Sequence, residues 1–353
     1  MMAWTIPTPE DQVLFLRNLQ RLLAEGLFVA SYKFALVRAL ADLAVLKGDD
    51  SGSPLPLDTK DIAAKFVELY WRQSRPFQLR GESTGLVLQQ NTGRQAAIIS
   101  KIVDTQQRCG TSLFRLKQEA SGEWTALVSE VDDVVRTMPL WKLQTVGEER
   151  LDFLYENLDK GSRITLKPGI AYCFRTFYEL VRDLIEGAWV RFVQRVNAEK
   201  LGSNTDLGSF LFGEDRASLE AYRPILMDVQ SGTCLYCGGS LPAQTEVDHF
   251  IPWSRYPADL GHNFVLAHKK CNNAKSDHLA AEKHLAAWAE RNRLHESVLR
   301  TRLQEEGLPC DALASIQIAR WVYHQTEVAN GQVWVVEKVL QHLGPTWPQC
   351  FAA

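Results

Sequence analysis

The 353-residue sequence contains no apolar run that approaches the roughly 18 residues of a transmembrane helix. Its first residues lack the basic head and the apolar stretch of a secretory signal peptide. It also lacks low-complexity tracts and internal repeats. These absences argue against membrane, secreted and repeat proteins. We therefore expect a cytoplasmic globular protein without a membrane partner, long enough for one large or two to three ordinary domains.

The seven cysteines do not suggest a disulfide framework, because their number is odd and they are scattered along a long chain. Three of them, Cys234, Cys237 and Cys271, fall within 38 residues. Histidine is absent from the first 248 residues, and six of the eight histidines lie between residues 230 and 300. This shared cluster of cysteine and histidine predicts a metal site.

The net charge of −3 does not predict a nucleic-acid partner by itself. The charges are uneven, however. Segment 72–117 has eight basic and two acidic residues, whereas segment 118–159 has ten acidic and three basic residues. Segment 72–117 could form a basic surface that follows a phosphate backbone, or the two segments could neutralise each other in the fold.

Apolar residues recur at helical spacing through the first 47 residues, again after Asp58, and over about 169–197. Short strands are expected within 114–131, and 202–213 reads as a loop and linker. Further helices are expected at 219–229 and after residue 275. The pattern predicts a mainly helical protein with a small α+β module.

Two metal-binding knuckles lie about 30 residues apart. The first is the CxxC pair Cys234 and Cys237, followed by two glycines, and the second is the HxxC pair His268 and Cys271. Four such ligands are the tetrahedral set of structural zinc, which leaves no open position for a catalytic water. This zinc would hold the fold together, and zinc ribbons that only bind partners share the pattern.

The residues between and beside the knuckles are more specific. Segment 246–252 reads as a short strand that carries Asp248 and His249 and ends at a proline. Asn263 precedes a second apolar run, and Asn272 directly follows the last zinc ligand. The expected layout is strand, loop, strand, helix.

These residues, in the segments CLYC, VDHFIP, GHNFVLAH and HKKCNNAK, resemble the HNH endonuclease superfamily with its ββα-metal fold. The resemblance covers about 45 of the 353 residues. The second knuckle begins with His268 where the family commonly has cysteine, which zinc accepts. Asn272 stands where the family often has histidine.

The resemblance implies a role for each matched residue. His249 would be the general base that takes a proton from the attacking water. Asp248 and Asn272 would bind the catalytic cation, and their oxygen atoms favour Mg²⁺ or Mn²⁺. Asn263 would brace the loop and orient His249. Two further residues could contact nucleic acid. Lys275 is either a phosphate contact or a solvated surface lysine. Arg255, beside Trp253 in the inter-strand loop, could also contact nucleic acid.

The resemblance therefore implies an enzyme that hydrolyses DNA to 5′-phosphate and 3′-hydroxyl ends. By analogy we expect a role in bacterial restriction or antiphage defence. Partners would be DNA, a second copy of the chain or a defence-system protein. The alternative is a non-catalytic, zinc-stapled module that binds nucleic acid or protein. The expected domains are a mostly helical region at 1–120 with the basic stretch 72–117, a helical region at 121–215, the HNH nuclease domain at 216–300 and C-terminal helices at 301–353.

Overall fold

The computed structural model describes residues 5–26, 28–78, 85–156, 161–201, 206–213 and 219–352. The chain divides into two compact units, Met1–Glu214 and Asp215–Ala353. The boundary expected between residues 215 and 216 falls outside the described residues. Within the described parts, no helix combines the length and the apolar composition needed to cross a membrane.

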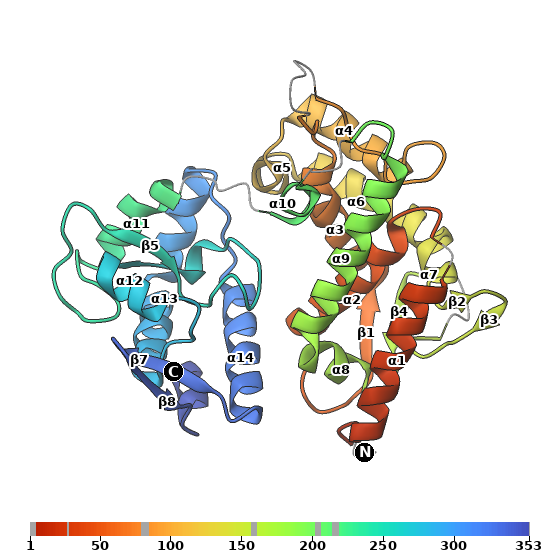
Figure 1. The fold of residues 1–353 in the computed structure, drawn as a ribbon. Helices are drawn as coiled ribbons and strands as arrows, with labels where there is room; N and C mark the ends of the chain where they lie inside the picture. Colours follow the sequence, from red (N-terminus) through yellow and green to blue (C-terminus); the bar gives the residue numbers. More distant parts are fainter. Residues whose placement is uncertain are drawn as a thin grey trace. The chain divides into compact units, whose positions relative to one another are not determined.

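The first unit is mostly helical, with two small antiparallel pairs of strands, β1 with β4 and β2 with β3 (Figure 1). Its elements are α1 Pro9–Glu25, α2 Tyr32–Lys47, β1 Leu55–Asp58, α3 Thr59–Gln73, α4 Ala97–Cys109, α5 Leu113–Glu119, α6 Ser121–Thr137, α7 Pro139–Lys142, β2 Thr145–Val146, β3 Glu149–Arg150, β4 Arg163–Leu166, α8 Ile170–Thr176, α9 Tyr178–Val196 and α10 Leu207–Phe212.

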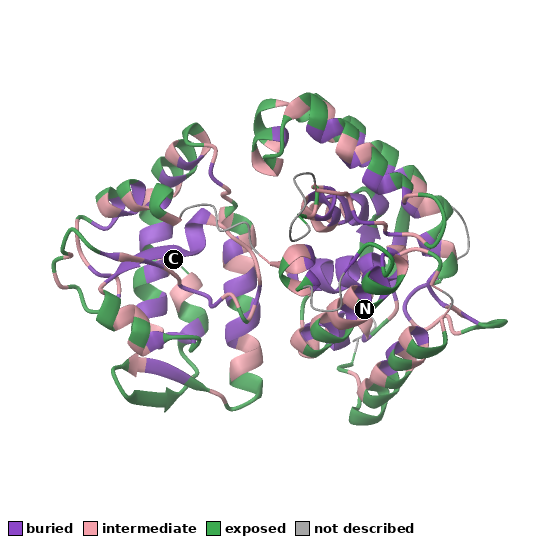
Figure 2. Ribbon diagram, turned by 45° about the horizontal axis from the view of Figure 1, so that its top comes forward, coloured by how far each residue is buried: buried purple, intermediate pink, exposed green. Residues whose placement is uncertain are grey.

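The core of the first unit forms around α2, which is buried from Lys33 to Val45 and packs against α3, α8 and α9. A helix that is buried on every side must neutralise any charge it carries. Arg38 does so through Asp42 (3.0 Å) and through Glu186 of α9. Figure 2 shows buried residues inside each unit and exposed residues on the outer faces of its helices.

Two local expectations for the first unit are wrong. The strands expected within 114–131 are helical, because Leu116 of α5 and Leu127 and Val131 of α6 are buried at helical spacing. Within 202–213, α10 forms where the Asp206 side chain caps the helix. The long helix expected at about 169–197 is present as α8 and α9, which meet at Phe177.

Some charges of the basic and acidic segments pair with each other. Lys101 on α4 contacts Glu130 on α6 at 2.6 Å, and Arg108 contacts Glu123 at 2.6 Å. Of the two readings of the basic stretch 72–117, these contacts favour mutual neutralisation. Arg80 lies outside the described residues.

The second unit surrounds the β5–β6 hairpin with helices. Its elements are η1 Leu219–Tyr222, α11 Arg223–Val229, β5 Glu246–His249, η2 Gly261–Asn263, β6 Phe264–Ala267, α12 Lys269–Lys275, α13 Glu282–Glu305, α14 Ala312–Val328, β7 Gln332–Val336, β8 Val339–His342 and η3 Trp347–Phe351. The β7–β8 hairpin is an addition to the C-terminal helices expected at 301–353.

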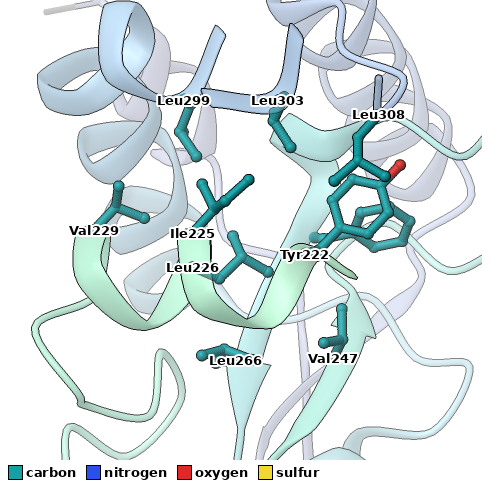
Figure 3. Packing of buried hydrophobic residues seen from close by; sticks show 10 residues of the cluster. Tyr222, Ile225, Leu226, Val229, Val247, Leu266, Leu299, Leu303 and Leu308 are labelled. Carbon is teal, nitrogen blue, oxygen red and sulfur yellow. The ribbon is translucent and has the colours of Figure 1, made fainter. Parts of the chain in front are cut away.

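An apolar cluster packs around the β5–β6 hairpin in the second unit (Figure 3). Leu226 of α11 lies between the hairpin residues Val247 and Leu266 and the α13 residues Leu299 and Leu303. Val247 and Leu266 are also paired across the strands. The apolar face of the hairpin is therefore covered by α11 and α13, so that the hairpin depends on helices from both sides of it in the sequence.

Candidate functional site

The expected strand, loop, strand and helix are confirmed. β5 pairs antiparallel with β6, in a register that sets Asp248 opposite Val265 and His249 opposite Phe264. α12 begins two residues after β6 and packs against β5. The second knuckle and the residues that follow it are thereby brought back to the strand that carries Asp248 and His249.

The four predicted zinc ligands, Cys234, Cys237, His268 and Cys271, come together at one point. Their ligand atoms all lie within 4.8 Å of one another. A hydrogen bond from Leu235 N–H to the Leu266 carbonyl (3.1 Å) joins the first knuckle to β6. The cluster is consistent with structural zinc, because four nitrogen and sulfur donors at this spacing complete a tetrahedral shell.

The His268 ring is oriented for that role. Its Nδ1 lies 3.3 Å from Cys237 Sγ, and its Nε2 lies 3.0 Å from the carbonyl oxygen of Ser240. A ring whose Nε2–H donates to that carbonyl keeps its lone pair on Nδ1, facing the thiols. Gly238, with φ +70°, supplies the left-handed turn of the first knuckle.

Asp248 is partly buried, and its carboxylate contacts two polar side chains. Its Oδ2 accepts a hydrogen bond from the Tyr236 hydroxyl (2.5 Å) and lies 3.1 Å from Lys275 Nζ. The Tyr236 ring is buried, edge-on to His284 and Trp334. Burial, together with the charge of Asp248, raises the pKa of Tyr236 well above its ordinary value, so this phenol remains a proton donor to the carboxylate.

Lys275 lies in a different place from either expectation. Its side chain is 1% exposed, and its ammonium also donates to the His249 carbonyl (2.9 Å). It is therefore neither a solvated surface lysine nor placed to meet a phosphate from the surface. One buried cation instead ties the end of α12 to the side chain of Asp248 and to the backbone of His249.

His249, the last residue of β5, has its imidazole held on several sides. Nε2 lies 2.8 Å from Oδ1 of Asp259, on the loop between the strands. The ring is edge-on to Phe264 at 4.7 Å and to Trp253 at 5.7 Å between centroids. These contacts place Trp253 against the histidine itself.

Asn263 bridges the two ends of the inter-strand loop. Its side-chain oxygen accepts from Ile251 N–H (2.8 Å), and its side-chain nitrogen donates to the Ile251 carbonyl (3.0 Å). Asn263 is 7% exposed, so water cannot easily replace these bonds. The amide therefore holds the backbone two residues beyond His249.

Helix α13 fixes the same loop from its other side. The carbonyl of His262 accepts hydrogen bonds from Trp288, Arg291 and Asn292, at 2.9, 2.9 and 3.0 Å. Arg291 also donates to the Phe264 carbonyl at 2.7 Å. Burial lowers the pKa of Arg291 to about 9. This guanidinium binds backbone carbonyls and the side-chain oxygen of Asn292.

Asn272 and Arg255, the other predicted site residues, are both partly buried. Asn272 lies on α12, one turn after His268, whose carbonyl accepts its backbone N–H (2.9 Å). Arg255 lies on the inter-strand loop, near the turn at Pro252. Both residues thus belong to the elements that surround His249.

Three residues of the site carry no sequence signal. Tyr236 stands between the first two zinc ligands, where any side chain would fit the CxxC pattern. Asp259 lies ten residues after His249 in an irregular loop, and Arg291 lies on a helix beyond the motif. Their parts in the site follow from contacts across the fold, which spacing along the chain does not encode.

Comparison with known proteins agrees with this geometry. Residues 234–278 match the family model of the HNH endonuclease. No curated protein matches the chain. The matched segment contains both knuckles, the β5–β6 hairpin, Asp248, His249 and all of α12. Over residues 234–278 this chain carries a domain of the HNH endonuclease family, a nuclease family whose substrates are nucleic acids.

Proposed function

We propose that the protein is a metal-dependent endonuclease that hydrolyses phosphodiester bonds of DNA and leaves 5′-phosphate and 3′-hydroxyl ends. One observation carries most of this proposal. The Lys275 ammonium contacts both the Asp248 carboxylate and the His249 carbonyl, at 3.1 and 2.9 Å. The helix that bears Asn272 is therefore tied to the strand that bears the candidate ligand and the candidate base.

The donor atoms fit a hard cation. Asp248 offers a carboxylate, whose Oδ2 already accepts a hydrogen bond from the Tyr236 hydroxyl. Asn272 offers an amide oxygen on α12, the helix packed against β5. Carboxylate and amide oxygens are ligands that Mg²⁺ and Mn²⁺ prefer. When bound, such a cation would offset the negative charge that builds on the phosphoryl oxygens.

His249 would act as the general base. A neutral imidazole can accept a proton from water at pH 7, and the ring is held by Asp259, Phe264 and Trp253. The water oxygen would form the new bond to phosphorus as the bond to the 3′ oxygen breaks. Asn263, through its two bonds to Ile251, would keep the loop after His249 in place.

The direct test is cleavage of supercoiled, linear and single-stranded DNA with Mg²⁺ added or omitted. Omission is preferable to a chelator, which would also remove zinc. We expect Mg²⁺-dependent cutting by the native protein, loss of it in His249→Ala, and retention in His342→Ala, a control on the exposed strand β8. Products should be substrates for DNA ligase, which requires 5′-phosphate ends.

Intact DNA in every arm, together with retained DNA binding, would instead support a zinc-stapled binding module. A role in restriction or antiphage defence is a separate part of the proposal. It predicts that bacteria expressing the native protein form fewer phage plaques than bacteria expressing His249→Ala. Equal plaque counts would argue against a defence role and would leave the cleavage test unaffected.

A further inference from the structure

The loop between β5 and β6 brings a second carboxylate to His249. Asp259 Oδ1 lies 2.8 Å from His249 Nε2, and the two side chains are 23% and 15% exposed. A partly buried contact this short is a charge-assisted hydrogen bond when the carboxylate is ionised. The nuclease motif of Asp248, His249, Asn263 and Asn272 assigns no role to Asp259.

The position of Asp259 is set by the C-terminal helices. Tyr256 is buried in the loop, and its ring is edge-on to Trp321 of α14. On the other side of Asp259, Gly261 N–H donates to the Pro309 carbonyl (2.8 Å). A Cβ on Gly261 would lie only 2.5 Å from Cδ1 of Leu303, so the backbone is pressed against α13. The carboxylate thus stands on a loop that is anchored on both sides.

The contact also selects which imidazole nitrogen carries the proton. An ionised carboxylate only accepts hydrogen bonds. A neutral His249 ring must therefore carry its proton on Nε2 in order to donate a hydrogen bond to Asp259. The lone pair then lies on Nδ1. Because Phe264 and Trp253 pack against the ring, it cannot readily turn to exchange its two nitrogens.

We propose that Asp259 is the positioning residue of His249, holding the ring with its proton on Nε2 so that Nδ1 faces the attacking water. This inference rests on the proposed nuclease function. In the step, an O–H bond of water breaks and an N–H bond forms on Nδ1, while the water oxygen bonds to phosphorus. The bond from phosphorus to the 3′ oxygen breaks, and that oxygen takes a proton from solvent. Asp259 would stabilise the imidazolium so formed.

Kinetics supply the first test, with Asp259→Asn in the full-length, zinc-loaded protein. Asparagine keeps the size of the side chain and loses its charge. We expect kcat for Mg²⁺-dependent DNA cleavage to fall by on the order of 10²- to 10⁴-fold, with KM changed less than about threefold. The matched control is Asp228→Asn, which removes an exposed carboxylate paired with Arg302 and should cleave like the native protein. A native kcat in Asp259→Asn would overturn the proposal.

The second test does not require cleavage. Long-range ¹H–¹⁵N spectra at pH 8.5 distinguish the two neutral tautomers of an imidazole, and His249→Gln identifies the His249 signals. We expect the Nε2–H form in the native protein and a shift towards Nδ1–H in Asp259→Asn. An Nδ1–H ring in the native protein, or an unchanged tautomer in the variant, would overturn the proposal. Absence of cleavage by the native protein would count against the nuclease function alone, because the spectra still decide the role of Asp259.

Discussion

Acid should destabilise the second unit through His262, a histidine that the proposed chemistry does not use. Its side chain is 1% exposed, and neither ring nitrogen has a hydrogen-bond partner among the described residues. Burial lowers the pKa of His262 to about 4, and the nearby guanidinium of Arg291 contributes. The folded protein therefore keeps this ring neutral at pH values where an exposed histidine would be charged.

The size of the effect follows from the two pKa values. Below the ordinary pKa of 6.5, His262 binds a proton in the unfolded chain but stays neutral in the folded protein. The free energy of unfolding therefore decreases as the pH is lowered. Each pKa unit is worth about 1.4 kcal/mol. The loss from this residue is absent above pH 6.5, about 2 kcal/mol at pH 5, and about 3 kcal/mol at pH 4.

The assay is urea unfolding of the full-length protein at pH 7.5 and pH 5, followed by tryptophan fluorescence. His262→Met replaces the ring with an apolar side chain that adapts to the same space. We expect the variant to lose about 2 kcal/mol less than the native protein between these pH values. Acid release of zinc would affect both proteins and cancels in the comparison. His342→Met, on an exposed strand, should behave like the native protein. An equal loss in the native protein and His262→Met would refute the reasoning.

Three further predictions concern the metal and the polar contacts of the site. Cys237→Ser should abolish stoichiometric zinc binding and cooperative unfolding of the second unit, because structural zinc contributes folding free energy; a variant that binds zinc and melts normally would contradict this. Lys275→Met should lower the free energy of unfolding by about 3–5 kcal/mol, since it leaves the Asp248 carboxylate without its buried cation. The control Lys270→Met removes an exposed lysine and should cost under about 1 kcal/mol. Equal costs of the two substitutions in thermal melts would contradict the ion pair of Lys275 with Asp248. Asn263→Ala should cost about 2–5 kcal/mol in urea unfolding, because both polar groups of the Ile251 backbone lose their partners, and a cost below about 1 kcal/mol would mean that water replaces the amide.

The zinc knuckles and the short strands of the domain could be predicted from sequence, because each depends on residues only a few positions apart. Two residues between cysteines form a knuckle almost regardless of the rest of the fold. The apolar runs that flank Asp248 and follow Asn263 are short enough to read as strands, and the structure pairs them as β5 and β6. In the first unit, helical periodicity likewise predicts the helices α1, α2 and α3.

The same local reasoning fails where neighbours decide the structure. Segment 114–131 contains β-branched and aromatic residues that suit strands, yet its Leu116, Leu127 and Val131 are buried within helices α5 and α6. For the charges of segment 72–117, the sequence leaves both a basic surface and mutual neutralisation open, and the ion pairs of Lys101 with Glu130 and of Arg108 with Glu123 favour neutralisation. Sequence order does not reveal that these helices lie side by side.

By itself, the sequence determined the family of the domain and the four candidate zinc ligands, because knuckles and strand ends are local arrangements of residue types. Only the tertiary structure decided the environment of the candidate base. It buried Lys275 against Asp248 and His249, although lysine side chains are usually exposed. It also brought Asp259 to His249 and used α13 and α14, outside the matched segment, to hold the loop there. These contacts join residues from 10 to 65 positions apart, and packing alone brings such residues together.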